Sequence, residues 1–115
     1  ICVPHTSETD DMINDSFINE LKNKYLINIS RASIVNEKFL FKLLNKNILR
    51  GAAIDVWYNN PDKLKKNKCF PSKYPFHQLN NLIMSPHAGS HAVGSSQALI
   101  EDSMSQLRKY LENII

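Results

Sequence analysis

The feature that most constrains how this chain can fold is the alternation of short apolar runs with stretches of helical spacing. Three runs have the length of buried strands and end at polar, Gly or Pro residues, over 25–29, 52–56 and 82–84. A fourth run, over 1–3, is expected to be the end of another strand. Nearly continuous apolar strands separated by helices are typical of a parallel sheet with helices packed on its faces. The sequence therefore predicts an α/β, doubly wound arrangement.

The two stretches between these runs carry apolar residues at helical spacing. In the first they are Phe17, Ile18 and Leu21, and in the second they are Phe39, Leu40, Leu43 and Leu44. Residues three and four apart share one face of a helix, so each stretch can pack that face on the sheet. Gly51 follows the second stretch where a helix C-cap is expected, and Lys46 and Arg50 lie near the negative end of the helix dipole.

The rest of the chain divides into an irregular segment and a final helix. Residues 57–81 are rich in Asn, Lys and Pro and have no period, which predicts a long loop. Four lysines of this loop are expected to face water, with an anion site as the alternative; they are Lys63, Lys65, Lys66 and Lys68. After Pro86, apolar residues recur at helical spacing and predict a helix over 93–113.

Size, charge and cysteine usage limit the classes of protein. A chain of 115 residues with 43% hydrophobic residues supplies one modest core, and 14 basic against 11 acidic residues is too even a balance to indicate nucleic acid binding. Cys2 and Cys69 form no C-x-x-C pair, so neither a zinc site nor a disulfide framework is expected. No apolar run reaches the roughly 18 residues of a membrane span. A reducing, cytoplasmic setting is the prediction.

Polar residues follow each predicted strand, and we expect them to meet, because ligands of open α/β sheets bind beyond the carboxyl ends of the strands. Arg31, Asp55 and His87 follow three different runs. An arginine can hold an anionic substrate, an aspartate can orient a cofactor and a histidine can transfer a proton. The alternatives are a surface or carbonyl-capping role for Arg31, a turn or cap role for Asp55 and a structural role for His87.

Four motifs, in this order, resemble the D-isomer-specific 2-hydroxyacid dehydrogenases, a family that includes phosphoglycerate, glycerate and formate dehydrogenases. The motifs are PHTSETDDMIND, LINISRASIVNEKFL, ILRGAAIDVW and NNLIMSPHAGS, and together they span nearly the whole chain. The resemblance implies part of a Rossmann-like doubly wound parallel sheet. It also implies that residues 1–92 are the C-terminal portion of an NAD-binding domain and that residues 93–115 form a helix returning toward a separate substrate domain.

The resemblance implies roles for individual residues. Arg31 would bind the carboxylate and carbonyl of a 2-oxo or 2-hydroxy acid through its planar guanidinium. His87 would be the general acid/base that exchanges a proton with the hydroxyl oxygen while hydride passes to or from the nicotinamide. Asp55 would contact the nicotinamide carboxamide. With these three, the residues at cofactor-lining positions are Val3, Pro4, Thr6, Ile29, Ser30, Gly89 and Ser90.

Two positions depart from the family pattern. The family usually has a glutamate that hydrogen-bonds the catalytic histidine, and here Asn60 stands at that place. A neutral amide can orient a histidine ring but cannot raise its pKa as a carboxylate does, so the catalytic role of His87 is expected to be weakened or retuned. The formate dehydrogenases of the family carry a neutral glutamine there. Ala32 replaces the usual glycine after the arginine, and would be strained if that position needs positive φ.

The G-x-G-x-x-G turn that binds pyrophosphate, and the substrate domain, do not occur in these 115 residues. The chain also starts on an apolar run without Met, so we interpret it as a fragment, inactive alone, of an enzyme that uses NAD, with NADP left open. A small 2-hydroxy or 2-oxo acid is the expected partner, no metal site is expected, and a homodimer is predicted for the complete protein. His5, His77 and His91 are expected at the surface or in hydrogen bonds, because nothing repeats metal-ligand spacing.

Two other classes of function stay open. One is a non-catalytic module that senses dinucleotide or dimerises, as some corepressors of the family do; Asn60 favours it and the presence of Arg31 and His87 opposes it. The other is a nucleic-acid binder, which predicts steeply salt-dependent binding. No basic stripe with interleaved aromatic residues supports that second class.

Overall fold

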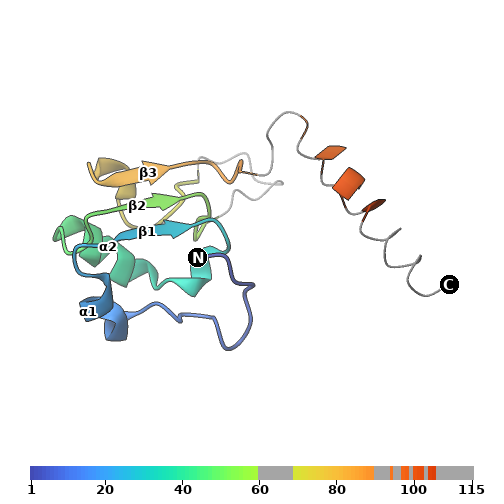
Figure 1. Ribbon diagram of the computed structural model, residues 1–115. Coiled ribbons are helices and arrows are strands. Elements are labelled where there is room, and N and C mark those ends of the chain that lie inside the picture. Colours follow the sequence, from blue (N-terminus) through green and yellow to red (C-terminus); the bar gives the residue numbers. More distant parts are fainter. Residues whose placement is uncertain (60–68, 90–93, 95–96, 99, 103, 106–115) are drawn as a thin grey trace.

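The computed structural model describes residues 1–59, 69–89, 94, 97–98, 100–102 and 104–105 (Figure 1). Its strands are β1 (Tyr25–Asn28), β2 (Gly51–Ile54) and β3 (Leu82–Met84). Its α-helices are α1 (Ile18–Leu21) and α2 (Glu37–Asn45), and three short 3-10 helices are η1 (Asp15–Phe17), η2 (Ala32–Ile34) and η3 (Phe76–Gln78). Both predicted helical stretches and three of the predicted strands are therefore present, and each strand boundary lies within two residues of the one expected.

The three strands form a parallel sheet in the order β1-β2-β3, which confirms the predicted α/β class. Asn28 pairs with Ile54, and Ile54 pairs with Met84, so all three strands end at the same level. The strand expected over 1–3 is wrong, because these residues have no regular structure. They nevertheless lie beside β1, where the amino group of Ile1 donates a hydrogen bond of 2.6 Å to the carbonyl of Ile27.

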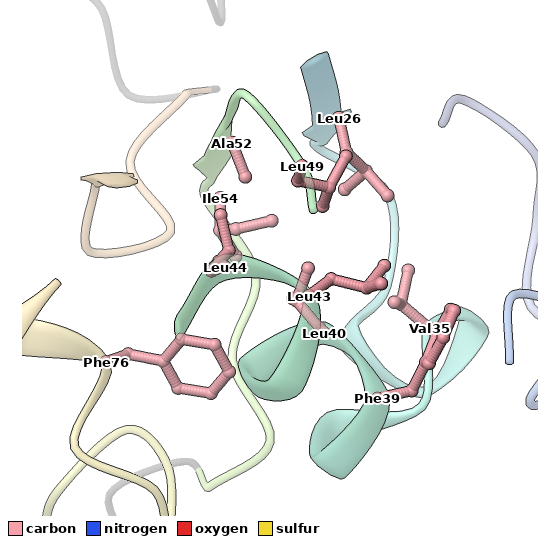
Figure 2. Packing of buried hydrophobic residues seen from close by; sticks show 10 residues of the cluster. All are labelled: Leu26, Val35, Phe39, Leu40, Leu43, Leu44, Leu49, Ala52, Ile54 and Phe76. Carbon is pink, nitrogen blue, oxygen red and sulfur yellow. The ribbon is translucent and has the colours of Figure 1, made fainter. Parts of the chain in front are cut away.

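The core forms between one face of α2 and one face of the sheet. Four side chains of α2 are each 1% exposed: Phe39, Leu40, Leu43 and Leu44. Figure 2 shows Leu43 and Leu44 on the side of Leu26 of β1 and of Ala52 and Ile54 of β2, and Phe39 beside Val35. Burying one such leucine or phenylalanine stabilises a fold by roughly 1.5–3 kcal/mol. This packing holds the carboxyl ends of β1 and β2 in place, and those ends carry the candidate site.

The opposite face of the sheet is open in the described part of the chain. Tyr25 and Ile27 of β1 are 65% and 57% exposed, and Ile83 of β3 is 72% exposed. The expectation that the strands are buried along their whole length is therefore wrong for these residues, because α2 covers only one face. On the open face, the Arg50 guanidinium lies 5.6 Å from the centre of the Tyr25 ring.

Side chains and turns define both ends of α2. At its start, the Asn36 side chain accepts a hydrogen bond from the N–H of Phe39, as an N-cap residue does. At its end, Asn47 adopts a φ of 52°, and its N–H bonds the carbonyl of Leu44 at 3.0 Å. The next N–H, of Ile48, reaches back to an earlier carbonyl of the helix at 2.8 Å, which completes a Schellman turn.

The predicted C-cap role of Gly51 is wrong, because α2 ends six residues earlier and Gly51 opens β2. A Cβ at Gly51 would lie 3.2 Å from the carbonyl oxygen of Asn81 and 3.3 Å from the ring of Tyr25. That carbonyl also accepts the N–H of Ala52 at 3.0 Å, so it cannot move freely. Close approach of another backbone segment, rather than a helix end, explains the glycine.

The loop after β2 is anchored at several described points. The Tyr58 hydroxyl donates to the carbonyl of Val35 at 2.8 Å, and the Ser72 hydroxyl donates to the carboxylate of Glu37 at 2.7 Å. Phe76, in η3, is 1% exposed and belongs to the core. The loop is thus less irregular than its composition predicts, because η3 packs within it. The four lysines lie outside the described residues.

The predicted final helix falls mostly outside the described residues, and so does the predicted division at residue 92. Within it, residues 97–98, 100–102 and 104–105 are helical, and a long helix over 93–113 stays a prediction. Among the helices that the structure describes, none has the length and apolar character needed to cross a bilayer.

Candidate functional site

The carboxyl ends of the three strands surround an open cleft. Hydrogen bonds of the sheet continue one step beyond the strands, from the N–H of Asp55 to the carbonyl of Asn28 at 3.1 Å and from the N–H of Ser85 to the carbonyl of Ile54 at 3.0 Å. The residues that follow each strand therefore meet at one edge of the sheet. The cleft has a volume of ≈ 870 Å³ and is lined by Ile29, Arg31, Asp55, Ser85, His87, Ala88 and Gly89.

Arg31 is placed by a turn that a buried asparagine holds together. Asn28, at the end of β1, is 1% exposed; its side chain accepts from the N–H of Ser30 at 3.1 Å and donates to the carbonyl of Arg31 at 2.9 Å. The Arg31 guanidinium donates through Nη1 to the carbonyl of Ser30 at 2.7 Å. No carboxylate among the described residues forms an ion pair with Arg31. The guanidinium at the cleft is therefore available for an anionic ligand.

Asp55 is buried, at 9% exposed, and its carboxylate accepts three hydrogen bonds. Oδ1 accepts from the Ser85 hydroxyl at 2.6 Å and from the N–H of Ala88 at 3.1 Å, and Oδ2 accepts from the N–H of Gly89 at 3.1 Å. The Ser85 hydrogen bond is the main cause that lowers the pKa of Asp55; burial opposes it, and the two backbone N–H groups and the charge of His87 add to the lowering. Asp55 is therefore ionised at neutral pH.

Gly89 allows the close approach of this carboxylate. A Cβ at Gly89 would lie 3.0 Å from Asp55 Oδ2. Any other residue there would push against the same oxygen that its own N–H binds. The structure thus gives Gly89, which was predicted from the resemblance as a cofactor residue, a direct role in seating Asp55.

His87 lies between these anchored residues in an uncommon backbone conformation. Its φ is 58°, in the left-handed region that residues with a side chain seldom adopt. Ser85 before it and Ala88 and Gly89 after it all bind Asp55. The loop is therefore held on both sides of His87. A strained backbone conformation of this kind persists only where the surrounding contacts hold it in place.

The structure brings some of the predicted site residues together and separates others. Five of them line the cleft: Ile29, Arg31, Asp55, His87 and Gly89. Four others do not line it: Val3, Pro4, Thr6 and Ser30. They lie in or next to the segment beside the end of β1. There the Ser30 hydroxyl donates to the carbonyl of Val3, and the Thr9 hydroxyl donates to the carbonyl of Pro4. Asn60 and Ser90 lie outside the described residues.

The position of Ala32 does not need a positive φ, so the condition under which it would be strained is not met. Ala32 begins η2, is 8% exposed and has no positive φ. Its small side chain is instead buried. The backbone after Arg31 therefore accepts alanine without the conformational cost expected at that position.

Reasoning from the sequence gave no role to two residues next to the site, Trp57 and Ser85. Trp57 donates its indole N–H to the carbonyl of Ser85 at 2.8 Å. A tryptophan two residues after a strand-end aspartate is a usable signal, because a partly buried indole N–H needs an acceptor. Which acceptor it finds depends on a residue 28 positions away.

The remaining described histidines lie away from the cleft. His5 Nε2 lies 2.8 Å from the carboxylate of Asp10, and the ring of His77 stacks with that of Phe70 at 6.0 Å. Within the described ranges, no three His, Cys, Asp or Glu residues are grouped so as to hold a metal ion. His91 lies outside these ranges.

Comparison with known proteins identifies the family. Residues 1–89 match the model of the D-isomer specific 2-hydroxyacid dehydrogenase, NAD binding domain. The chain belongs to this family. This match confirms the family that the four motifs resemble, the D-isomer-specific 2-hydroxyacid dehydrogenases. It also confirms that the chain has the fold of a Rossmann-like NAD-binding domain.

Individual relatives agree with this assignment. A glyoxylate reductase of Thermofilum pendens is 31% identical over 102 residues, covering 88% of this chain and 28% of the relative. A D-isomer specific 2-hydroxyacid dehydrogenase from Xanthobacter autotrophicus, solved with NADPH and MES, superposes with a TM-score of 0.61 at 25% identity, over 75% of this chain and 26% of the other. An NAD-dependent formate dehydrogenase from Staphylococcus aureus, solved with NAD, has a similar fold, with a TM-score of 0.67 at 24% identity over 96% of this chain and 31% of the other.

This 2-hydroxyacid dehydrogenase chain spans little more than a quarter of its curated glyoxylate reductase relative, at 28%.

Proposed function

We propose that this chain is the part of an NAD(P)-dependent 2-hydroxyacid dehydrogenase that carries the substrate arginine and the acid/base histidine. One observation supports this most directly: Arg31, Asp55 and His87 follow three different strands of the sequence, yet line one cleft. An anion-binding group, a carboxylate and a proton-transfer group at one place are what the interconversion of a 2-oxo and a 2-hydroxy acid requires.

The residues of the cleft fit a nicotinamide ring. Ile29 is 59% exposed and offers an apolar surface at the cleft. Asp55 Oδ2 accepts one hydrogen bond from the described residues and has a second lone pair, which can accept an amide N–H such as that of a carboxamide. When bound, NADH or NADPH supplies the hydride. Ser30, Val3, Pro4, Thr6 and Ser90 belong to the proposed cofactor site through the family pattern.

In this mechanism each protein group has one task. Arg31 binds the substrate carboxylate and orients the neighbouring carbonyl, through the N–H groups that its bond to Ser30 leaves free. His87 donates a proton to the carbonyl oxygen in the direction of reduction and removes it in the direction of oxidation. In the sequence, Asn60 stands at the place of the usual glutamate, and a neutral amide there adds no negative charge beside the acid/base histidine. Asp55 holds the His87 loop and faces the cofactor.

Glyoxylate is the first substrate we propose to test, because the relative from Thermofilum pendens is a glyoxylate reductase. The assay follows NADH or NADPH absorbance with the natural protein, expressed from its complete reading frame, and a panel of glyoxylate, hydroxypyruvate, pyruvate and 3-phosphohydroxypyruvate, with formate in the oxidative direction. Turnover of a 2-oxo acid that falls roughly 100-fold or more in His87→Ala is the expected result.

The same experiment separates the catalytic from the non-catalytic alternative. Binding of NADH without turnover of any acid would contradict the proposal and support a dinucleotide-sensing or dimerisation module. Asn60→Glu is the informative variant in that case, since it restores the carboxylate of the family. Gain of turnover in that variant would show that the loss of the glutamate had silenced the site.

We further propose that the complete protein is a cytoplasmic homodimer. Cys2 and Cys69 are both free and exposed, as suits a reducing compartment. The open sheet face with Tyr25, Ile27 and Ile83 offers apolar area that other parts of the protein or a second subunit can cover. Light scattering of the complete protein tests the dimer, and a monomer at micromolar concentration would contradict it.

A further inference from the structure

We infer that Ser85 and Trp57 are positioning residues that hold the backbone of the His87 loop, residues 85–89, in the form the acid/base histidine needs. This inference rests on the proposed function, since it assigns His87 the proton transfer. Neither residue is among those that the family pattern implies.

His87 cannot keep its conformation by itself. A φ of 58° costs a residue with a side chain free energy relative to the right-handed or extended regions. Such conformations persist only where the surroundings determine them. The loop therefore needs anchors on both sides of His87.

The anchors are present and converge on Ser85. Its N–H bonds the carbonyl of Ile54 at 3.0 Å, its carbonyl accepts the Trp57 indole N–H at 2.8 Å, and its hydroxyl donates to Asp55 at 2.6 Å. On the other side of His87, the N–H groups of Ala88 and Gly89 bind the same carboxylate at 3.1 Å each. Asp55 thus joins Ser85, two residues before His87, to the two residues after it.

The Ser85 hydroxyl has a specific task in this arrangement. Asp55 Oδ1 accepts both from this hydroxyl and from the N–H of Ala88, so the hydroxyl fixes where the oxygen lies for the Ala88 bond. Without it, only the two backbone N–H groups of Ala88 and Gly89 hold the carboxylate, and the bond that follows His87 loosens. Trp57 fixes the carbonyl of the same residue, and its ring packs edge-on against Phe76 of the core at 5.9 Å between ring centres.

The chain offers a matched control for this pair. Ser72 also donates its hydroxyl to a carboxylate, that of Glu37, at 2.7 Å, and it is 5% exposed. This second pair lies outside the cleft and joins the loop after β2 to the start of α2. Ser72→Ala removes the same kind of hydrogen bond without touching the His87 loop.

The test uses the natural full-length protein, with Ser85→Ala, Ser85→Thr, Trp57→Phe and Ser72→Ala. We expect kcat to fall roughly 10-fold or more in Ser85→Ala, the equivalent of one hydrogen bond to a charged group. The KM for the 2-oxo acid should stay within about threefold, because the Arg31 contact is kept. Ser85→Thr keeps the hydroxyl and should keep kcat within about threefold of native. Trp57→Phe should lower kcat with its ring packing preserved, and Ser72→Ala should leave kcat unchanged.

Histidine-selective ¹³C NMR gives a second readout that does not need turnover, with the His87 resonance assigned from its loss in His87→Gln. We expect Ser85→Ala to shift this resonance and Ser72→Ala to leave it in place. Equal kcat values and equal His87 resonances in these two variants would overturn the inference. If the native protein turns over no acid but Ser85→Ala still moves the resonance, the positioning stands and the proposed function fails.

Discussion

Replacing Arg31 by lysine tests the substrate-binding role in a way that total removal cannot. Lysine keeps the positive charge and the length of the side chain but loses the planar, two-pronged donor geometry. In the structure, Nη1 of Arg31 is tied to the carbonyl of Ser30 at 2.7 Å, while the rest of the guanidinium is free of carboxylate partners among the described residues. The free edge is the part that a substrate carboxylate can use.

The expected magnitude follows from the number of hydrogen bonds lost. A lysine ammonium replaces a bidentate contact by a single one, so one hydrogen bond between charged groups disappears, which is worth about 1.5–3 kcal/mol. At 1.36 kcal/mol for each factor of ten, kcat/KM for the 2-oxo acid should fall about 10- to 150-fold. The Kd for NADH should change little, because Arg31 meets the acid and not the hydride donor.

Steady-state kinetics on the natural protein, with NADH binding measured by fluorescence, provides the assay. Arg50→Lys is the matched control, since Arg50 lies over the Tyr25 ring on the open sheet face, away from the cleft. Two results would refute the reasoning: a value of kcat/KM for Arg31→Lys within threefold of native, or an equal fall in Arg50→Lys.

Three further predictions concern the scaffold of the site, measured by urea denaturation of the natural protein. Asn36→Ala should lower the free energy of unfolding by about 1 kcal/mol through loss of the N-cap of α2, and an unchanged midpoint would count against the cap. Leu43→Ala should cost about 2–5 kcal/mol, because this side chain is 1% exposed in the core; a cost below 1 kcal/mol would contradict that packing. Tyr58→Phe should cost about 1–3 kcal/mol by leaving the carbonyl of Val35 without its donor. Burial raises the pKa of Tyr58 above its usual value of 10, so its contribution is fully present below pH 10 and is lost as pH rises toward the raised pKa. The difference between native and Tyr58→Phe should therefore shrink above pH 10, and a constant difference would refute the pH argument.

Local patterns in the sequence predicted the elements well where spacing alone decides them. The apolar face of α2, with Leu40 and Leu43, follows from residues three and four apart, and it packs on the sheet as expected. The end of the same helix was misplaced at Gly51. The helix ends at Asn45 instead, and Asn47 forms the turn after it, because asparagine tolerates a positive φ. The nearby glycine was the stronger signal in the sequence and displaced this weaker one.

The candidate site shows the same division. The order of Arg31, Asp55 and His87 after three strands predicted one shared edge, and the cleft brings them together. The role of Asp55 in binding the loop was not foreseen, because its three partners lie 30 to 34 residues further along the chain. Nothing in the sequence near Asp55 indicates which donors will reach it.

The sequence by itself determined the class of fold, the parallel sheet, the core face of α2 and the family, because periodicity and motif order are properties of neighbouring residues. Only the tertiary structure decided that the sheet has one covered and one open face among the described residues, that Gly51 and Gly89 make room for another segment, and that His87 is held at a φ of 58°. Each of these features depends on contacts between residues distant in the sequence, which meet only when the strands align. The free energy of these contacts therefore depends on the packed chain and cannot be read from any single stretch of the sequence.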